Sequence, residues 1–536
     1  MNTLMSFIHH SLQPRLNDPA NTRLWLPGLL AKMTNEQGGS VLPIRSDAQD
    51  LGFMQGEHGG YVAERFVQTW SIMNQKDAVA DPLQPYPALV LSDVTLEGLQ
   101  NLLLQQVSSQ PTLPGYDANV VLLPNHYPDP TQGLEMPPLS LKGRYQIDQS
   151  LWVEDSYRTV ITGTGTFNAT FSNCVINAPL ALETTGSAEQ RKPVVALSSL
   201  TISAISGEHP TLVFDDLTLE GDLDQSAQLI MFIKQALNAP DGQLSMLATV
   251  AEMLNSPDNL TSFSSSLSEH LSISLDELLS GVPEDGLPTD SDNQQGATQL
   301  DVYFFDRLRV ALNQADSDWY LPLLLSNSKD PQLEPYTHPH LLIPDQIIAG
   351  LTYTDIELND LKVVGFSNAF APLASGILTS PDIALVIAFG LLPEGSTLTE
   401  QVLRLAIPPA PPVKLYTRLS LTQQGIVPVP LKGSVYASLL DCSLPLVLTV
   451  SGHDISDLEL TINELGFLWG AEPVDFQVEL EPRNSLLESM IVKMLVKPVV
   501  QNVIKEKLAS AMAEQRAEMS ANLTRMARAN LINKLS

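Results

Sequence analysis

Cysteine and aromatic residues are scarce in this sequence of 536 residues. The two cysteines, Cys174 and Cys442, lie in opposite halves of the chain, and aromatic residues make up only 6% of it. Two distant cysteines cannot provide a disulfide framework or a cysteine-rich zinc site. We expect both to be small buried apolar residues. Hydrophobic residues still account for 44% of the chain, so aliphatic side chains must build most of a large core.

Basic residues are also few, with 29 Lys and Arg against 60 Asp and Glu and a net charge of −31. This balance argues against a nucleic acid as the partner, because phosphate binding needs a basic surface. The charge is uneven, since the segment from Leu486 to Ser536 carries eight basic residues and four Glu. Two interpretations of that segment stay open: a solvated helix of mixed charge, or a basic handle for a protein partner or a membrane surface.

Long apolar runs are missing as well. No run approaches the about 18 residues that a membrane-spanning helix needs, so we predict no transmembrane segment. The first residues, MNTLMSFIHHSLQPRL, lack the basic start and uninterrupted apolar core of a secretory signal peptide. The predicted location is cytoplasmic, with release that needs no signal peptide as the alternative.

Motifs of catalysis and of metal binding are equally sparse. The sequence has no phosphate-binding loop of the G-x-x-x-x-G-K type and no H-E-x-x-H helix. The G-T-G at 163–165 is followed by β-prone sequence, whereas a dinucleotide site needs a helix there. His338 and His340 lie near acidic residues, but a loop with two ordinary histidines is the favoured interpretation. We therefore predict no catalytic residue, no metal, no cofactor and a protein that is not an enzyme.

One short phrase occurs three times. LVLSDVTLEGL begins at Leu89 and LVFDDLTLEGD begins at Leu212, with seven of eleven positions identical. A looser copy, LTYTDIELNDL, begins at Leu351. Apolar residues alternate with polar ones in each copy, which is typical of a strand with one buried face. The phrase predicts a strand that is reused along the chain, either from a common structural origin or by coincidence.

Four regions are predicted from the patterns along the chain. Residues 1–80 are predicted to be a helical amino-terminal segment, and residues 81–282 a first domain of strands followed by helices. Residues 283–298 are acidic and polar and are predicted to be a linker. Residues 299–536 are predicted to form the second domain, with strands and then a long apolar helix from about Asn484 that Pro498 should kink.

The first domain contains the run LKGRYQI, TGTGTFNATF, LTISAI, LVFDDLTLEGD and QLIMFIKQALN, in this order between residues 137 and 238. This order resembles the insect takeout proteins of the tubular lipid-binding (TULIP) superfamily. That superfamily also includes the bactericidal/permeability-increasing (BPI) proteins and the clostridial P-47 proteins. The stretch YTDIELNDLKVVGFSNA, together with the terminal helix, is similar to a second such domain. The resemblance implies an α+β fold of two tandem domains, each with a long apolar helix wrapped by a highly curved antiparallel sheet.

The resemblance also implies binding of a lipid or another hydrophobic molecule between helix and sheet. Methionine is flexible and suits a layer whose contents vary. The predicted lining therefore consists of apolar residues from the two long helices: Met231, Phe232, Leu487, Met490, Ile491 and Met494. A dry, packed core is the alternative for each of them. The alternative function is a solid-cored structural or toxin-associated protein-interaction module of the P-47 type.

Overall fold

The computed structural model describes the chain in a series of separate segments. They are residues 3–18, 20–21, 24–26, 60–68, 89–97, 102–112, 114–124, 138–153, 156–186, 192–205, 210–218, 230–231, 234, 237–238, 240–255, 257–279, 296–314, 316–322, 336–364, 369–390, 413–439, 441–469, 475–514 and 516–535. The chain divides into two compact units. The amino-terminal unit comprises Leu12–Glu183, Pro193–Leu271 and Leu535–Ser536, and the carboxy-terminal unit comprises Met1–Ser11, Thr184–Lys192 and Ser272–Lys534.

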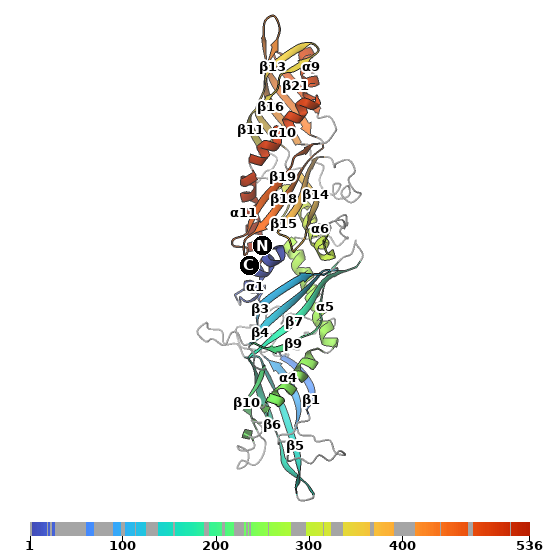
Figure 1. The fold of residues 1–536 in the computed structure, drawn as a ribbon, viewed down its shortest axis with the longest axis vertical. Helices are drawn as coiled ribbons and strands as arrows, with labels where there is room; N and C mark the ends of the chain where they lie inside the picture. Colours follow the sequence, from blue (N-terminus) through green and yellow to red (C-terminus); the bar gives the residue numbers. More distant parts are fainter. Residues whose placement is uncertain are drawn as a thin grey trace. The chain divides into compact units, whose positions relative to one another are not determined.

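The amino-terminal unit contains two antiparallel sheets (Figure 1). The first has the order β1-β2-β5-β6-β10, and the second has the order β3-β4-β7-β8 with β9 paired to β7. The strands are β1 (Gly60–Gln68), β2 (Leu89–Glu97), β3 (Leu102–Pro111), β4 (Tyr116–Pro124), β5 (Ser140–Val153), β6 (Ser156–Ser172), β7 (Cys174–Thr185), β8 (Lys192–Leu197), β9 (Thr201–Ala204) and β10 (Thr211–Leu217). Helix α4 (Pro240–Leu254) and the greater part of α5 (Pro257–Leu279) follow them in this unit, and the last residues of α1 (Leu4–Leu16) belong to it as well.

The carboxy-terminal unit again has two antiparallel sheets, ordered β11-β13-β16-β17-β21 and β14-β15-β18-β19, with β12 paired to β13 and β20 to β18. Its strands are β11 (Tyr336–Ile343), β12 (Gln346–Ile348), β13 (Leu351–Val364), β14 (Ala369–Gly376), β15 (Asp382–Gly390), β16 (Val413–Gln424), β17 (Val429–Leu439), β18 (Asp441–Ser451), β19 (Glu459–Leu465), β20 (Leu468–Trp469) and β21 (Asp475–Glu481). Its helices are α6 (Gln299–Asn313), α9 (Ser485–Leu495), α10 (Pro498–Glu514) and α11 (Arg516–Leu535).

The strand orders of the two units correspond. In chain order, β2, β5, β6 and β10 occupy the same successive places in one sheet as β13, β16, β17 and β21 in the other. The second sheets correspond in the same way, and helices come after the last long strand in both units. The chain is therefore α+β with antiparallel sheets, as predicted. Each unit has two hydrogen-bonded sheets where the sequence predicted one, and the predicted domain ranges stay predictions.

The repeated phrase forms a strand with a β-bulge in all three copies. In β2 the pairing with β5 skips one extra residue between Ser92 and Thr95, and in β13 the pairing with β16 does the same between Thr354 and Glu357. Asp355 in that second interval has a φ of 53°, the left-handed conformation that aspartate tolerates. In β10 the bulge lies between Phe214 and Asp216. The phrase therefore encodes a strand that bends at its Asp.

Alternation along the strands buries one face of each sheet. In β16 the side chains of Val413, Leu415, Leu419 and Leu421 are buried, and the residues between them are exposed or half-buried, apart from the buried Thr417. Close approach of backbones also requires glycine at more than one place among the described residues of each unit. A side chain at Gly165 would overlap the carbonyl oxygen of Thr218, so two backbones approach closely at this glycine.

Side chains of α5 cover the free edge of β8. The backbone N–H groups of Val195 and Leu197 donate hydrogen bonds to the hydroxyls of Ser268 and Ser264 at 2.8 and 2.9 Å. The two serines are four residues apart, so both lie on one face of the helix. This arrangement satisfies the edge of the sheet without a further strand.

The carboxy-terminal unit repeats this device with α11 and the edge strand β19. The N–H groups of Leu460 and Ile462 donate to the hydroxyls of Thr524 and Ser520 at 2.9 and 3.0 Å. Basic residues of α11 bind the same unit, since Arg528 Nε donates to the carbonyl of Leu458 at 2.6 Å. Arg516 and Lys534 likewise bind Asn463 and Asp318. The predicted basic handle is therefore partly engaged in holding its own helix on the sheet.

Two sequence predictions are wrong. Residues 60–68 form β1 and pair with β2, although the segment 1–80 was predicted to be helical. Residues 336–343 form β11, so His338 and His340 lie in a strand and not in a loop. Both segments are edge strands, and polar residues in each, with Pro339 in β11, hide the alternation that identifies inner strands.

Candidate hydrophobic ligand site

Helix α9 is held on the sheet of β11, β13, β16, β17 and β21 by its first turn. Asn484 caps the helix by accepting a hydrogen bond from the N–H of Leu487 at 3.2 Å. Glu488 accepts the N–H of Leu480 on the edge strand β21 at 3.0 Å. The helix ends at Leu495, and α10 begins at Pro498, whose missing N–H suits the first helical position. The predicted kink at this proline is thus a break between two helices.

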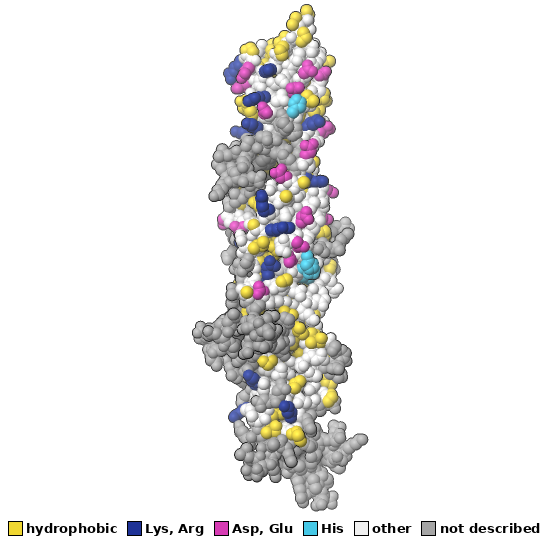
Figure 2. Space-filling view, turned by 90° about the vertical axis from the view of Figure 1, so that its left-hand side faces the viewer, with side chains coloured by type: hydrophobic (Ala, Val, Ile, Leu, Met, Phe, Trp, Pro, Cys, Tyr) yellow, Lys and Arg dark blue, Asp and Glu magenta, His cyan; other side chains and the backbone are white. Residues whose placement is uncertain are grey.

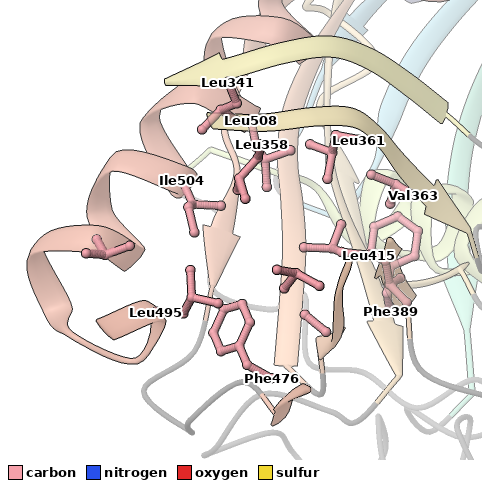
Figure 3. Close-up of a cluster of buried hydrophobic side chains, with 14 of the residues drawn as sticks. Leu341, Leu358, Leu361, Val363, Phe389, Leu415, Phe476, Leu495, Ile504 and Leu508 are labelled. Carbon is pink, nitrogen blue, oxygen red and sulfur yellow. The ribbon is translucent and has the colours of Figure 1, made fainter. Parts of the chain in front are cut away.

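The buried faces of α9 and α10 and the sheet beneath them form what we call the helix–sheet layer. Ile491, Met494 and Leu495 are fully buried, and α10 continues the apolar face. Figure 1 shows both helices lying along the strands of this sheet. In Figure 3 the side chains of the helices point towards those of the strands. The labelled members of this hydrophobic cluster are Leu341, Leu358, Leu361, Val363, Leu415, Phe476, Leu495, Ile504 and Leu508, together with Phe389 from β15 of the other sheet.

The residues predicted as a lining are placed differently by the structure. Ile491 and Met494 lie inside the helix–sheet layer, Leu487 packs at its margin, and Met490 is half-buried. The four α9 residues thus share one side of the helix, where Ile491 and Met494 are buried and Leu487 and Met490 are half-buried. Their role in binding stays a prediction.

The predicted lining of the first domain is only partly described. Ile230, Met231, Lys234 and Leu237 are helical, as the apolar pattern predicted. Met231 is 55% exposed and does not belong to the core, whereas Leu237 is buried. The assignment of Met231 to a buried lining is therefore wrong, because the helix turns this side chain outwards. Phe232 lies outside the described residues.

Sequence reasoning missed Tyr353, which faces the helix–sheet layer from β13. Its side chain is fully buried within the same hydrophobic cluster as Ile491 and Met494. Its hydroxyl has no hydrogen-bond partner among the described residues. Burial raises the pKa of this phenol, so the hydroxyl stays protonated and can donate. The repeated phrase could have indicated that Tyr353 is buried, because Tyr353 occupies the position of the apolar residues Leu91 and Phe214 in the other two copies.

The amino-terminal unit shows a contrasting tyrosine. Tyr145 is equally buried in the cluster that contains Leu247 and Val250 of α4. Its hydroxyl donates to the carbonyl of Thr218 at 2.7 Å, and burial raises its pKa to about 12. Its hydrogen-bonding capacity is therefore used inside the protein, while that of Tyr353 is available.

The described residues contain no group of three His, Cys, Asp or Glu side chains that could hold a metal ion. Within the same part of the chain, no helix has the length and apolar character needed to cross a membrane. His340 Nδ1 is 2.8 Å from Asn359 Oδ1 on the neighbouring strand, so this histidine makes an ordinary cross-strand contact.

No protein-family model and no curated protein matches this sequence. Among solved structures, the chain is similar to Takeout 1 of Epiphyas postvittana, with 13% identity and a TM-score of 0.24 over 39% of this chain and 83% of that one. It is also similar to lipopolysaccharide binding protein, with 10% identity and a TM-score of 0.20 over 78% of this chain and 81% of that one. At these TM-scores the likenesses do not indicate a function for this chain.

Proposed function

We propose that the carboxy-terminal unit binds a long-chain amphiphile, such as a fatty acid, in the helix–sheet layer, and that the protein is not an enzyme. The observation that carries this proposal is the buried hydroxyl of Tyr353, which lacks a partner among the described residues. A buried polar group that goes unsatisfied costs about 1–3 kcal/mol, so a bound polar atom there is favoured. The aliphatic surroundings suit an acyl chain, whose burial contributes about 0.8 kcal/mol for each methylene.

In this proposal the polar group of the ligand accepts a hydrogen bond from Tyr353, and its chain displaces contacts among Leu487, Met490 and Met494. Met side chains have several low-energy shapes and can re-pack around chains of different length. The correspondence of strand orders supports a tandem pair of TULIP-like domains. The order of sequence patterns between residues 137 and 238, which resembles that of the takeout proteins, agrees with a lipid as the ligand. The alternative is a solid core that serves protein interaction.

Native mass spectrometry and solvent extraction of the purified full chain test the proposal. We expect a co-purified amphiphile, or uptake of added palmitate, and a loss of affinity of about tenfold in Tyr353→Phe, which corresponds to one hydrogen bond. Tyr416→Phe is the matched control, because Tyr416 lies on the neighbouring β16, half-buried against Tyr436 and outside the core cluster.

A solid core gives different results. The protein would then be recovered repeatedly without ligand, take up neither palmitate nor phospholipid, and gain stability in Tyr353→Phe because an unsatisfied group is removed. That set of outcomes would overturn the proposal and leave the protein-interaction alternative.

A further inference from the structure

Three turns of the carboxy-terminal unit meet at one end of its larger sheet. Thr352 pairs with Ile347 of β12 on one side and with Gln424 of β16 on the other, so the β12–β13 and β16–β17 turns lie side by side. The Nζ atom of Lys497 donates to the carbonyl oxygen of Ile347 at 2.8 Å, which brings the α9–α10 junction to the same place. We call this region the hairpin end, comprising residues 347–352, 424–432 and 493–500.

Apolar side chains at the hairpin end face solvent. Ile426 is fully exposed, and Val427, Ile347 and Val499 are 71%, 67% and 63% exposed. Val429 and Val496 extend the same surface. In Figure 2 hydrophobic side chains cover the upper end of the described surface, and charged side chains of both signs begin below it. Single exposed aliphatic residues are ordinary, but six in three adjoining turns form an unusual patch.

The charge of the hairpin end is opposite to that of the whole chain. Its three segments contain Lys432, Lys493 and Lys497 and no Asp or Glu, although the sequence has 60 acidic residues. Glu481 lies opposite Lys432 on β21 and offsets part of its charge, whereas Lys493 is exposed on the last turn of α9. Surfaces that enter the headgroup region of anionic lipids combine exposed apolar side chains with lysine and lack carboxylates. The hairpin end has this composition.

The backbone of the hairpin end also suits a lipid interface. Pro428, Pro430 and Pro498 lie within the hairpin end and carry no N–H group. Fewer donors therefore need a partner when the turn leaves water, where each unsatisfied donor would be costly. A protein partner can supply acceptors for backbone N–H groups, whereas the interior of a bilayer cannot. The lack of donors therefore favours a bilayer over a protein as the partner.

We infer that the hairpin end docks on the surface of an anionic lipid bilayer, with Ile426 and Val427 entering the headgroup region and Lys493 and Lys497 facing the lipid phosphates. This inference stands independently of the proposed ligand site, because it concerns exposed residues only. It also gives the site a route to lipid, since Tyr353 directly follows the end residue Thr352.

Vesicle flotation of the full chain tests the inference. We expect binding to vesicles of phosphatidylcholine mixed with phosphatidylglycerol, weaker binding at high salt, and little binding to phosphatidylcholine alone. The double variant Ile426→Asp/Val427→Asp should lose at least tenfold in the bound fraction, and Lys493→Gln/Lys497→Gln should lose the preference for anionic vesicles. Leu468→Asp, at a residue of β20 that is 59% exposed, is the matched control and should bind normally.

Two results would overturn the inference. One is a wild-type protein that floats with neither vesicle type, or whose flotation is unchanged in Ile426→Asp/Val427→Asp. The other is self-association of the wild type in gel filtration that the same double variant abolishes without any vesicle binding, which would assign the hairpin end to a second copy of this chain. Circular dichroism of each variant, unchanged from wild type, verifies that the fold is retained.

Discussion

The side-chain amide of Asn313 satisfies both backbone groups of Ala371 on the edge strand β14. Its Nδ2 donates to the carbonyl of Ala371 at 2.9 Å, and its Oδ1 accepts the N–H of the same residue at 2.7 Å. One amide thus imitates a neighbouring strand, and it does so at a buried position. Asn17 makes the same pair of bonds to Leu104 on β3, the corresponding edge strand of the other unit.

Asn313→Leu should destabilise the carboxy-terminal unit by about 2–4 kcal/mol, because two buried backbone groups lose their partners at once. Urea unfolding followed by fluorescence measures the change. Asn530→Leu is the control, since Asn530 donates one exposed bond to Asp318 and its replacement should change stability by no more than about 0.5 kcal/mol. Equal effects of the two substitutions would contradict the role of Asn313.

Loss of the hydroxyls on α11 should uncover the edge of β19. In Ser520→Ala/Thr524→Ala the N–H groups of Ile462 and Leu460 lose their acceptors, at a cost of about 1–3 kcal/mol each when buried. An open edge also pairs with other chains, so light scattering should rise on mild heating. Ser510→Ala removes only a bond within α10 and serves as the control.

The basic carboxy-terminal segment includes the residues of α11 that cover β19. Deleting residues 516–536 to test for a protein partner would remove Ser520, Thr524 and Arg528 together and expose β19. Binding of a protein partner by this segment is better tested by substituting exposed basic residues that make few contacts within the unit. Arg525 is such a residue, since it is exposed and bonds only Asn522 of its own helix in the described contacts.

Gly433→Ala should destabilise the carboxy-terminal unit strongly. A Cβ atom at Gly433 would overlap the carbonyl oxygen of Glu479, and backbone atoms cannot swing aside as a side chain can. Overpacking of this kind costs about 1–3 kcal/mol or more. Gly425→Ala is the matched control in the β16–β17 turn, because its Cβ would meet nothing closer than 3.6 Å. A thermal shift that is the same for both variants would argue against the close approach of β17 and β21.

The sequence predicted inner strands well and edges poorly. β2 and β13 begin at Leu89 and Leu351, the first residues of two copies of the phrase that was predicted to be a strand, because a strand with one buried face has a period of two. β1 and β11 were missed, since an edge strand pairs on one side only and carries polar residues and Pro339. The repeated phrase predicted a strand in each copy, but the β-bulge near its Asp depends on the pairing with a partner strand that the sequence alone does not identify.

The candidate site was predictable in its helix and not in its sheet. The apolar stripe of α9 identified Ile491 and Met494, since helical periodicity marks the buried side directly. The prediction that Met231 is buried was wrong. Its helix is apolar on much of its circumference, so the spacing of apolar residues does not indicate which side faces the core. Tyr353 was missed because the availability of its hydroxyl depends on what surrounds it, which no pattern in one strand records.

The stability of the amino-terminal unit should fall as pH rises from about 10 to about 12. Burial raises the pKa of Tyr145 to about 12 from 10.0, so the unfolded chain releases this proton before the folded chain does. A raised pKa in the folded state leaves the stability complete below pH 10 and removes it through this window. Urea titrations across the window measure the loss, and Tyr145→Phe should flatten it while costing about 1 kcal/mol for the bond to Thr218.

Met494→Ala distinguishes a ligand-holding layer from a solid core. Met494 is fully buried, so its truncation should lower stability by about 2–5 kcal/mol in either case, whereas Leu486→Ala, at a residue 72% exposed, should have little effect. Added palmitate separates the two cases. If the layer accepts an acyl chain, the chain fills the space that Met494 vacates, and binding to the folded state alone raises the melting temperature with ligand concentration. If the core is solid, palmitate leaves the melting temperature of Met494→Ala unchanged, because no entrance leads to the cavity.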